Sequence, residues 1–253
     1  MLPLKDFNPT RRLAVLTIAL IAINAIVFLY QFQKPDDDSL GGQIAFACEF
    51  GVVPDHLVNG ADPAEPGPSS GAQQVTCQGL NQENPGWLTV LTSMFLHGGW
   101  LHLLGNMLFL WIFGNNVEDR LGRIRFIPFY LICGAVAALT QALADRSSEI
   151  PLIGASGAIS GVLGAYLLLY PRAMVLTLIL PIFLVPIPAW LMLGLYFLLQ
   201  FVYLGGEATV NGGGVAYLAH IGGFVAGLAL IKPFLIGREE PPEPPPRRAG
   251  PVY

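Results

Sequence analysis

The sequence has few charged residues. Asp, Glu, Lys and Arg make up 12% of its 253 residues, hydrophobic residues make up 53%, and the mean hydropathy is +0.57. Soluble globular domains carry about 25% charged residues, so this composition excludes an ordinary soluble domain. It predicts a polytopic protein of the lipid bilayer, and we expect no nucleic-acid partner.

Cysteine is also scarce. Three cysteines are too few for a disulfide scaffold. Two of them, Cys48 and Cys77, lie in residues 33–87, a segment rich in Pro, Gly and acidic residues that is typical of an extramembrane loop. If this loop faces an oxidising compartment, the two can form a disulfide, and two free or buried thiols are an equal alternative.

The histidines lack the pattern of a metal site. His97, His102 and His220 occur without HExxH spacing and without a nearby carboxylate, which disfavours zinc. We therefore expect neither a metal nor a cofactor.

Uncharged stretches divide the chain into six predicted membrane spans, which gives an all-α helical bundle. A helix needs about 20 apolar residues to cross a bilayer, and most of these stretches approach that length. The first follows Arg11 and Arg12 but is longer than the apolar core of a signal peptide, about 7–15 residues, so we expect it to be retained. The predicted spans are 13–32, 88–113, 126–144, 150–170, 189–204 and 214–231.

The longest uncharged stretch, 173–206, is too long for one straight helix. Pro181, Pro186 and Pro188 would each break helical hydrogen bonding. We therefore expect 173–188 to be an apolar interfacial or re-entrant segment that precedes the short fifth span.

Six spans place both ends of the chain on the same side of the membrane. Of the basic residues, only Lys34 and Arg146 fall on the other side, so the positive-inside rule predicts cytoplasmic ends. With no transit segment, this topology fits a bacterial inner membrane. The eleven basic residues on the cytoplasmic side are Lys5, Arg11, Arg12, Arg120, Arg123, Arg125, Arg172, Lys232, Arg238, Arg247 and Arg248.

The chain is thereby divided into three expected parts. They are a cytoplasmic segment 1–12, a membrane domain 13–236 with an extracytoplasmic loop 33–87, and a disordered cytoplasmic tail 237–253.

A serine and a histidine in two different spans are the candidates for catalysis. Ser156 in the fourth span and His220 in the sixth lie among small residues, so these two helices can approach closely. Both are expected about two helical turns below the outer face, at ~1.5 Å per residue, and hence at matched depth. A histidine within hydrogen-bond reach can take the serine proton during attack.

The second span carries candidates for an oxyanion hole. His102 and Asn106 are four residues apart and therefore share one helix face. Together with the backbone N–H of Ser156 they can donate to a developing oxyanion, where one donor is worth about 2.7–4 kcal/mol of barrier. The site is expected to open to the extracytoplasmic side.

Each of these residues also has a non-catalytic interpretation. A lone serine in a small-residue span is usually a packing residue, whereas a histidine inside a membrane span is often functional because polar groups are costly there. His102 and Asn106 can instead form a polar clamp between helices, and His97 is expected to hold a loop against the helix top. The sequence GASGA around Ser156 lacks the G-x-S-x-G pattern of soluble hydrolases.

Three stretches resemble the rhomboid intramembrane serine proteases. They are HGGWLHLLGNMLFLWIFGNNVEDRLG, GASGAISGVLGAY and AHIGGFVAG, and the resemblance covers about residues 87–231. It implies a six-span bundle with a Ser–His dyad, in which Ser156 is the nucleophile and His220 the general base. It also implies that His102 and Asn106 stabilise the oxyanion.

The resemblance implies structural roles for three further residues. Glu118 and Arg120 match the E-x-R motif of the family, and we expect them to pair and organise the cytoplasmic turn. Gly227 matches a packing glycine on the side of the sixth span that faces Ser156.

One position departs from the family pattern. Some rhomboids place an aromatic residue four positions after the nucleophile, where the catalytic histidine rests on it, and this chain has Ser160 there. We expect Tyr217 or Tyr166 to hold His220 instead.

The implied function is that of a serine endopeptidase that hydrolyses peptide bonds in or next to the transmembrane helices of membrane-protein substrates. Helical carbonyls are hydrogen-bonded, so the substrate must unwind locally, and we expect it to enter laterally past the fifth span. An alternative is a non-catalytic rhomboid-like chaperone or degradation adaptor, although such relatives commonly lack the serine or the histidine. A secondary transporter is disfavoured because no inverted repeat relates residues 13–113 to 126–231.

Overall fold

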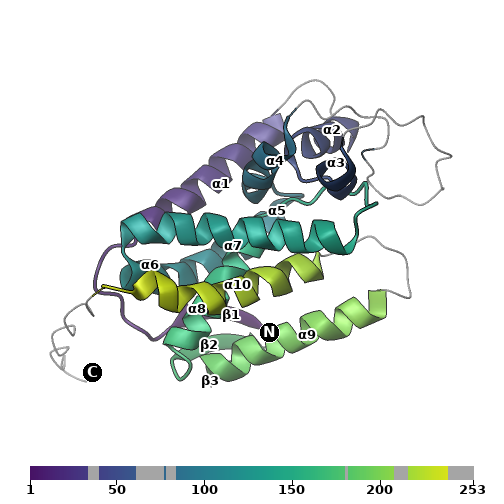
Figure 1. The fold of residues 1–253 in the computed structure, drawn as a ribbon. Coiled ribbons are helices and arrows are strands. Elements are labelled where there is room, and N and C mark those ends of the chain that lie inside the picture. Colours follow the sequence, from purple (N-terminus) through teal and green to yellow (C-terminus); the bar gives the residue numbers. More distant parts are fainter. Residues whose placement is uncertain (34–39, 61–76, 78–83, 180–181, 208–215, 239–253) are drawn as a thin grey trace, which may run out of the picture.

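Three helices with small residues at their contacts form the centre of the structure (Figure 1). The side chains of the middle helix are buried from Gly157 to Tyr166. A Cβ at Gly223 would clash with the carbonyl oxygen of Gly157, so only glycine lets these backbones approach so closely. The three helices are α7 (Arg123–Ala144), α8 (Ser156–Leu169) and α10 (Tyr217–Leu235). The structure is a computed structural model that describes residues 1–33, 40–60, 77, 84–179, 182–207 and 216–238.

Two long apolar helices flank this centre (Figure 1). They are α1 (Val15–Gln33) and α9 (Ala189–Glu207). Within the described residues, α1, α7 and α10 are long and apolar enough to cross a membrane, and a bent pair of helices brings the number of candidate spans to as many as four. The helix α8 and the stretch Ala189–Leu199 are shorter apolar helices. The chain is thus mostly helical, as predicted.

The second predicted span, 88–113, is bent rather than straight. Its two parts, Gly86–Phe95 and Trp100–Leu121, meet at an angle of 85°. Gly98 and Gly99 lie in the break, where two residues of low helix propensity interrupt an otherwise apolar helical run. The elements are α4 (Gly86–Thr92), the 3₁₀ turn η1 (Ser93–Phe95), α5 (Trp100–Phe109), the π-helical turn η2 (Leu110–Gly114) and α6 (Asn115–Leu121).

The fourth predicted span, 150–170, becomes helical only at Ser156. Pro151 lacks an amide hydrogen, and Gly154 has a φ of +123°, which residues with a side chain rarely adopt. These two residues explain why the stretch before Ser156 is a loop. The expectation that about two helical turns precede Ser156 and His220 was therefore wrong, because both residues lie in the first turn of their helices, and their depth in the membrane stays a prediction.

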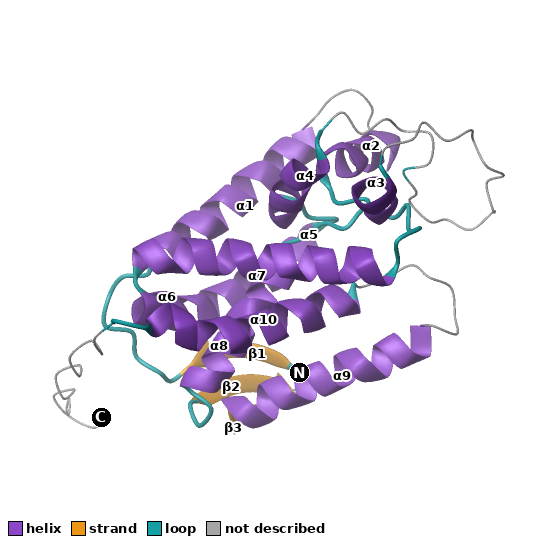
Figure 2. Cartoon of the chain, in the orientation of Figure 1, coloured by secondary structure: helices purple, strands orange, loops and turns teal. Residues whose placement is uncertain are grey.

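A small sheet corrects the expectation of a purely α-helical chain (Figure 2). Its three antiparallel strands follow the order β1-β2-β3, with Val175 paired to both Asp6 and Ile187. The segment 173–188 therefore supplies two paired strands, since its alternating and β-branched residues suit a strand and Pro186 and Pro188 are tolerated in the edge strand. Its expected place at the membrane interface stays a prediction. The strands are β1 (Leu2–Asp6), β2 (Met174–Ile179) and β3 (Phe183–Pro188).

The predicted loop 33–87 contains two short helices and a disulfide. The helices are α2 (Leu40–Phe50) and α3 (Pro54–Asn59), and the disulfide joins Cys48 to Cys77, which decides between the two alternatives left by the sequence. Val52 and Leu152 exchange backbone hydrogen bonds of 3.1 and 2.7 Å, so the loop is fastened to the segment that leads to Ser156. Residues 34–39, 61–76 and 78–83 of the loop, and 239–253 of the tail expected to be disordered, lie outside the described residues.

Candidate active site

Two distant segments bring an alcohol and an imidazole into contact. The Oγ atom of Ser156 and the Nε2 atom of His220 lie 2.8 Å apart, which is a hydrogen-bond distance. When Nδ1 carries the ring proton, Nε2 accepts the hydrogen bond that the serine hydroxyl donates. In this arrangement the histidine can remove the serine proton.

Glycine contacts between α8 and α10 hold this pair in place. A Cβ at Gly227 would lie 2.6 Å from the carbonyl carbon of Gly161, and a Cβ at Gly223 would clash with Gly157. Gly157, which makes the second of these contacts, directly follows Ser156, so the helix approach and the position of the hydroxyl are coupled.

The loop before Ser156 lies against two polar side chains of α5. A Cβ at Gly154 would lie 2.8 Å from Cε1 and Nε2 of His102 and 3.7 Å from Nδ2 of Asn106. The backbone N–H of Gly98 donates to Nδ1 of His102 over 3.4 Å, which leaves the ring proton on Nε2, the nitrogen that faces Gly154. The structure thus brings His102 and Asn106 to the same loop as Ser156.

Asn106 has a donor available to a ligand. Its Nδ2 atom is buried and has no hydrogen-bond partner among the residues that the structure describes. Buried amides normally have partners, so a free donor beside the loop of Ser156 suits a ligand oxygen.

A cavity of about 50 Å³ lies next to Ser156. Its walls include Gly157, Ala137 and Ala219, which are all small. The volume exceeds the ~30 Å³ share of one water molecule, so the cavity has room for a small side chain.

His97 is fully buried in the break between η1 and α5. The side chain of Gln31 in α1 donates to its carbonyl oxygen over 3.1 Å and accepts from its N–H over 3.3 Å. Its ring lies edge-on to that of His102, with 5.1 Å between the centroids. The hydrogen bonds, which the backbone of His97 makes, tie the break to α1, and a structural role of the His97 side chain stays a prediction. No cluster of three or more metal-ligating side chains occurs in the described part of the chain.

Comparison with known proteins identifies the family. Residues 84–236, more than half of the chain, match the Rhomboid domain. The chain belongs to the rhomboid family. Ser156, His220, His102 and Asn106 all lie within the matched residues, and the domain together with the apolar helices makes the chain an integral membrane protein.

Several curated rhomboid proteins are similar in sequence. Rhomboid protein 1, mitochondrial, from Saccharomyces cerevisiae is 33% identical over 145 residues, which are 56% of this chain and 40% of that protein. RHOMBOID-like protein 5 from Arabidopsis thaliana is 39% identical over 88 residues, 35% of this chain and 28% of that protein. Rhomboid protease GluP from Bacillus subtilis is 42% identical over 81 residues, 32% of this chain and 15% of that protein. The chain therefore matches less than half the length of each of these relatives.

The first residue of the rhomboid E-x-R motif has partners that the sequence did not reveal. The carboxylate of Glu118 accepts hydrogen bonds from the backbone N–H of Leu16 over 3.0 Å and of Thr17 over 2.7 Å, and from the Thr17 hydroxyl over 2.8 Å. A carboxylate at this position satisfies the first amides of α1 and complements the helix dipole. The expected pairing of Glu118 with Arg120 stays a prediction.

One of the two tyrosines expected to hold His220 is hydrogen-bonded to a residue of β1. The hydroxyl of Tyr166 donates to Oδ2 of Asp6 over 2.9 Å, so this side chain supports β1 and is not available to the histidine. Ser160, at the position where some rhomboids have an aromatic residue, is buried. Tyr217 stays a prediction as the support of His220.

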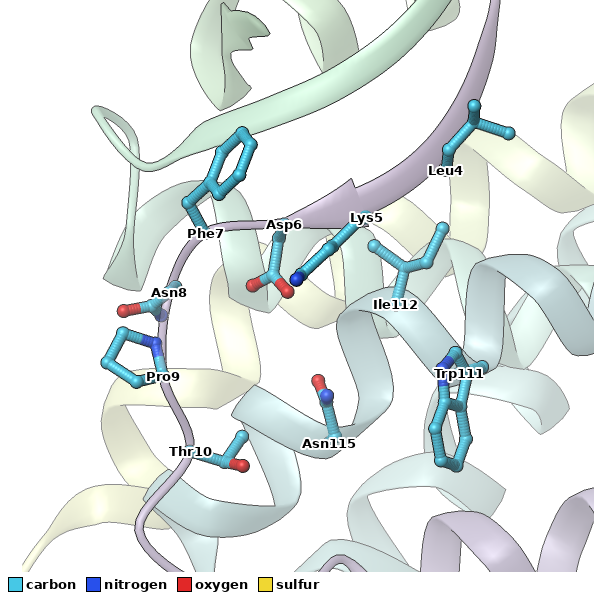
Figure 3. Close-up of a pocket in the computed structure, with 10 residues that line it drawn as sticks. All are labelled: Leu4, Lys5, Asp6, Phe7, Asn8, Pro9, Thr10, Trp111, Ile112 and Asn115. Atoms are coloured by element: carbon cyan, nitrogen blue, oxygen red, sulfur yellow. The ribbon is translucent and has the colours of Figure 1, made fainter. Parts of the chain in front are cut away.

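Asp6 belongs to a buried polar network that the sequence did not indicate. Its carboxylate accepts hydrogen bonds from Tyr166 in α8 and, over 2.7 Å, from the side-chain amide of Asn116 in α6. Burial raises the pKa of Asp6 above its ordinary value, and these hydrogen bonds oppose the rise. Figure 3 shows the carboxylate in a pocket of about 450 Å³ that Lys5 and Asn115 also line. No spacing in the sequence links Asp6 to its partners, because it lies more than 100 positions from both Asn116 and Tyr166.

Proposed function

We propose that the chain is an intramembrane serine endopeptidase that cleaves peptide bonds in or next to the transmembrane helices of membrane proteins. The observation that carries this proposal is the 2.8 Å contact between Oγ of Ser156 and Nε2 of His220 inside a rhomboid domain. One relative, Rhomboid protease GluP, is named as a protease of this family.

The Ser156–His220 contact supports a two-step hydrolysis. Nε2 of His220 takes the hydroxyl proton while Oγ of Ser156 forms a bond to the carbonyl carbon of the scissile peptide. The protonated imidazole then gives this proton to the leaving nitrogen as the C–N bond breaks. A water molecule adds to the resulting ester, with His220 again as base, and its cleavage releases the carboxylate product and restores the serine.

We infer that three donors stabilise the oxyanion in both steps. The backbone N–H of Ser156 lies at the start of α8, where the first amides have no partner within the helix. Nδ2 of Asn106 is an unsatisfied buried donor, and Nε2 of His102 faces the same loop. Each such donor lowers the activation barrier by about 2.7–4 kcal/mol when it is aimed at the developing charge.

The cavity beside Ser156 favours a substrate with a small residue at the scissile bond. Its volume of about 50 Å³ and its alanine and glycine walls leave no space for a large side chain. Small and helix-breaking residues also make local unwinding of the substrate helix less costly. We infer that the substrate is a transmembrane segment with a small residue at the point of cleavage, entering from the bilayer past α9.

The proposed topology has six spans with both ends in the cytoplasm. The helix α8 and the stretch Ala189–Leu199 of α9 would be two short spans, and α4 to α6 would form the remaining, bent span. The distribution of basic residues supports the orientation. The disulfide of Cys48 and Cys77 supports an oxidising compartment on the side of the loop 33–87, as at the outer face of a bacterial inner membrane.

The test is cleavage of a single-span substrate by the purified protein in detergent. Ser156→Ala and His220→Ala are each expected to lower kcat by about 10⁴-fold or more. The matched controls are Ser160→Ala, which removes another buried hydroxyl of α8, and His56→Ala, which removes an imidazole from α3; both should retain activity. Wild-type cleavage by either of the first two variants would refute the proposed roles.

The same assay distinguishes a non-catalytic chaperone or adaptor. Such a protein would bind the substrate without cleaving it, and Ser156→Ala would not change its effect on the substrate. Labelling of the wild type by a fluorophosphonate, absent in Ser156→Ala, favours the protease.

A further inference from the structure

A second pocket lies at the opposite end of the bundle from Ser156. It has a volume of about 550 Å³, and we call it the arginine pocket because Arg12, Arg123, Arg125 and Arg238 line it. It is formed where α6 ends, α7 begins and α10 ends (Figure 1). The Ser156–His220 pair is at the other end of α10, which starts at Tyr217.

The guanidinium groups of this pocket are close enough to repel one another. The pKa of Arg238 is lowered, first by burial and then by the charges of Arg12, Arg125 and Arg120, whereas Asp119 opposes the shift. Like charges held together cost free energy unless a counter-charge joins them. The Nε atom of Arg238 is buried without a hydrogen-bond partner in the described part of the chain, so one donor is still unsatisfied.

Hydrogen bonds fix two of the arginines in position. Nη1 of Arg125 donates to the carbonyl oxygens of Phe234 over 2.8 Å and of Ile236 over 3.0 Å, at the end of α10. Nη2 of Arg238 donates to the carbonyl oxygen of Asp119 over 3.3 Å. These partners are neutral carbonyls, so within the described residues these hydrogen bonds position the positive charge without neutralising it.

The two carboxylates at the pocket are already engaged with backbone amides. Glu118 accepts hydrogen bonds from Leu16 and Thr17, as described above, and Oδ2 of Asp119 accepts from the N–H of Arg11 over 2.9 Å. Two carboxylates beside the four arginines that line the pocket leave its described lining with a positive charge.

One wall of the arginine pocket is apolar and exposed. Leu13 is 69% exposed and Ile124 is 91% exposed, and both line the pocket beside the arginines. Leu13 lies two residues before α1 and Ile124 lies in the first turn of α7, and both helices are long enough to cross the bilayer. The pocket therefore lies at the membrane surface, with charged groups on one side and hydrocarbon on the other.

We propose that the arginine pocket binds the phosphate headgroup of an anionic phospholipid, with its acyl chains along Leu13 and Ile124. Guanidinium groups form charge-assisted, bidentate hydrogen bonds with phosphate. Basic pockets between membrane helices suit such headgroups, and the exposed apolar wall matches a lipid better than a soluble anion.

The test is native mass spectrometry of the full chain titrated with phosphatidylglycerol, with phosphatidylcholine as the neutral lipid. The double variant Arg12→Gln/Arg123→Gln removes two exposed guanidinium groups of the pocket. It is expected to weaken phosphatidylglycerol binding about thirtyfold, which corresponds to about 2 kcal/mol at 1.4 kcal/mol per factor of ten.

The matched control is Arg11→Gln/Arg172→Gln, which removes the same charge from two exposed arginines that do not line the pocket. It should bind phosphatidylglycerol as the wild type does, and both double variants should unfold at the wild-type temperature in phosphatidylcholine alone. Equal loss in both variants, or equal retention of the two lipids by the wild type, would overturn the proposal.

Two further arms distinguish other occupants. Displacement of the bound lipid by inorganic phosphate at equal concentration would assign the pocket to a soluble anion and overturn the lipid assignment. Glu239 and Glu240 directly follow Arg238 in the sequence. If Glu239→Gln/Glu240→Gln binds phosphatidylglycerol and the wild type does not, the chain's own carboxylates fill the pocket, and the proposal fails.

Discussion

Replacement of Gly227 by alanine tests the helix contact that brings Ser156 and His220 together. The added Cβ would lie 2.6 Å from the carbonyl carbon of Gly161, whereas ordinary contacts of this kind are 3.4 Å or longer. The added Cβ would overlap the carbonyl oxygen of Gly161 still more closely, so the backbones of α8 and α10 must separate locally by more than about 0.8 Å, the difference between these two distances. Over-packing of this kind costs about 1–3 kcal/mol, more than the ~1 kcal/mol that alanine gains over glycine in a helix.

The expected result of Gly227→Ala is a loss of both stability and activity. The free energy of unfolding, measured by SDS titration in mixed micelles, should fall by up to about 2 kcal/mol, which is the over-packing cost less the helix-propensity gain. The catalytic constant should fall by about 10- to 100-fold, because a displacement near 1 Å disturbs the 2.8 Å contact of the pair.

The matched control is Gly194→Ala in α9. A Cβ at Gly194 meets no atom within 4 Å, so the same substitution should stabilise the protein by up to ~1 kcal/mol and leave cleavage unchanged. If Gly227→Ala instead stabilises the protein and leaves cleavage unchanged, as Gly194→Ala should, α8 and α10 do not approach closely at Gly227 in the protein. The reasoning from packing to activity is then wrong.

Three other substitutions test separate parts of the structure. Cys48→Ala/Cys77→Ala opens a loop with a sequence separation of 29 residues, and chain entropy predicts a loss of about 3–4 kcal/mol, which unfolding with and without reductant will measure. Asn106→Ala should lower kcat by about 10²–10³-fold with little change in KM, and an effect on KM alone would contradict the oxyanion role. For Asp6, burial raises the pKa in the folded state, so the stability of the wild type relative to Asp6→Asn should be greatest below the unfolded value, near 3.8, and fall as the pH rises above it. Unfolding temperatures measured from pH 4 to pH 7 that run parallel for the two proteins would exclude this effect.

The sequence predicted which residues form the candidate site better than it predicted their positions in the fold. Ser156 and His220 were found from small residues around a polar group in an apolar span, a signal that needs no knowledge of distant contacts. The expectation of helical turns before Ser156 was wrong because Pro151 and Gly154 delay the start of α8, a backbone effect that hydropathy does not register.

Segments paired across long distances were predicted least well. The hairpin at 173–188 was expected to be interfacial because it is apolar and contains prolines, and its strand character depends on pairing with residues 2–6, more than 160 positions away. The break in the second span was also missed, since Gly98 and Gly99 weaken a helix without fixing an angle of 85°.

Composition and local pattern by themselves determined that this chain is a helical membrane protein with a serine and a histidine in glycine-rich spans. These properties follow from the cost of charge and open backbone in lipid, which acts on each segment separately. Only the tertiary structure decided that the two side chains touch, that Glu118 joins the start of α1, and that arginines from three parts of the chain gather in one pocket. Those contacts depend on how the helices pack, and packing is a property of the whole chain rather than of any one stretch.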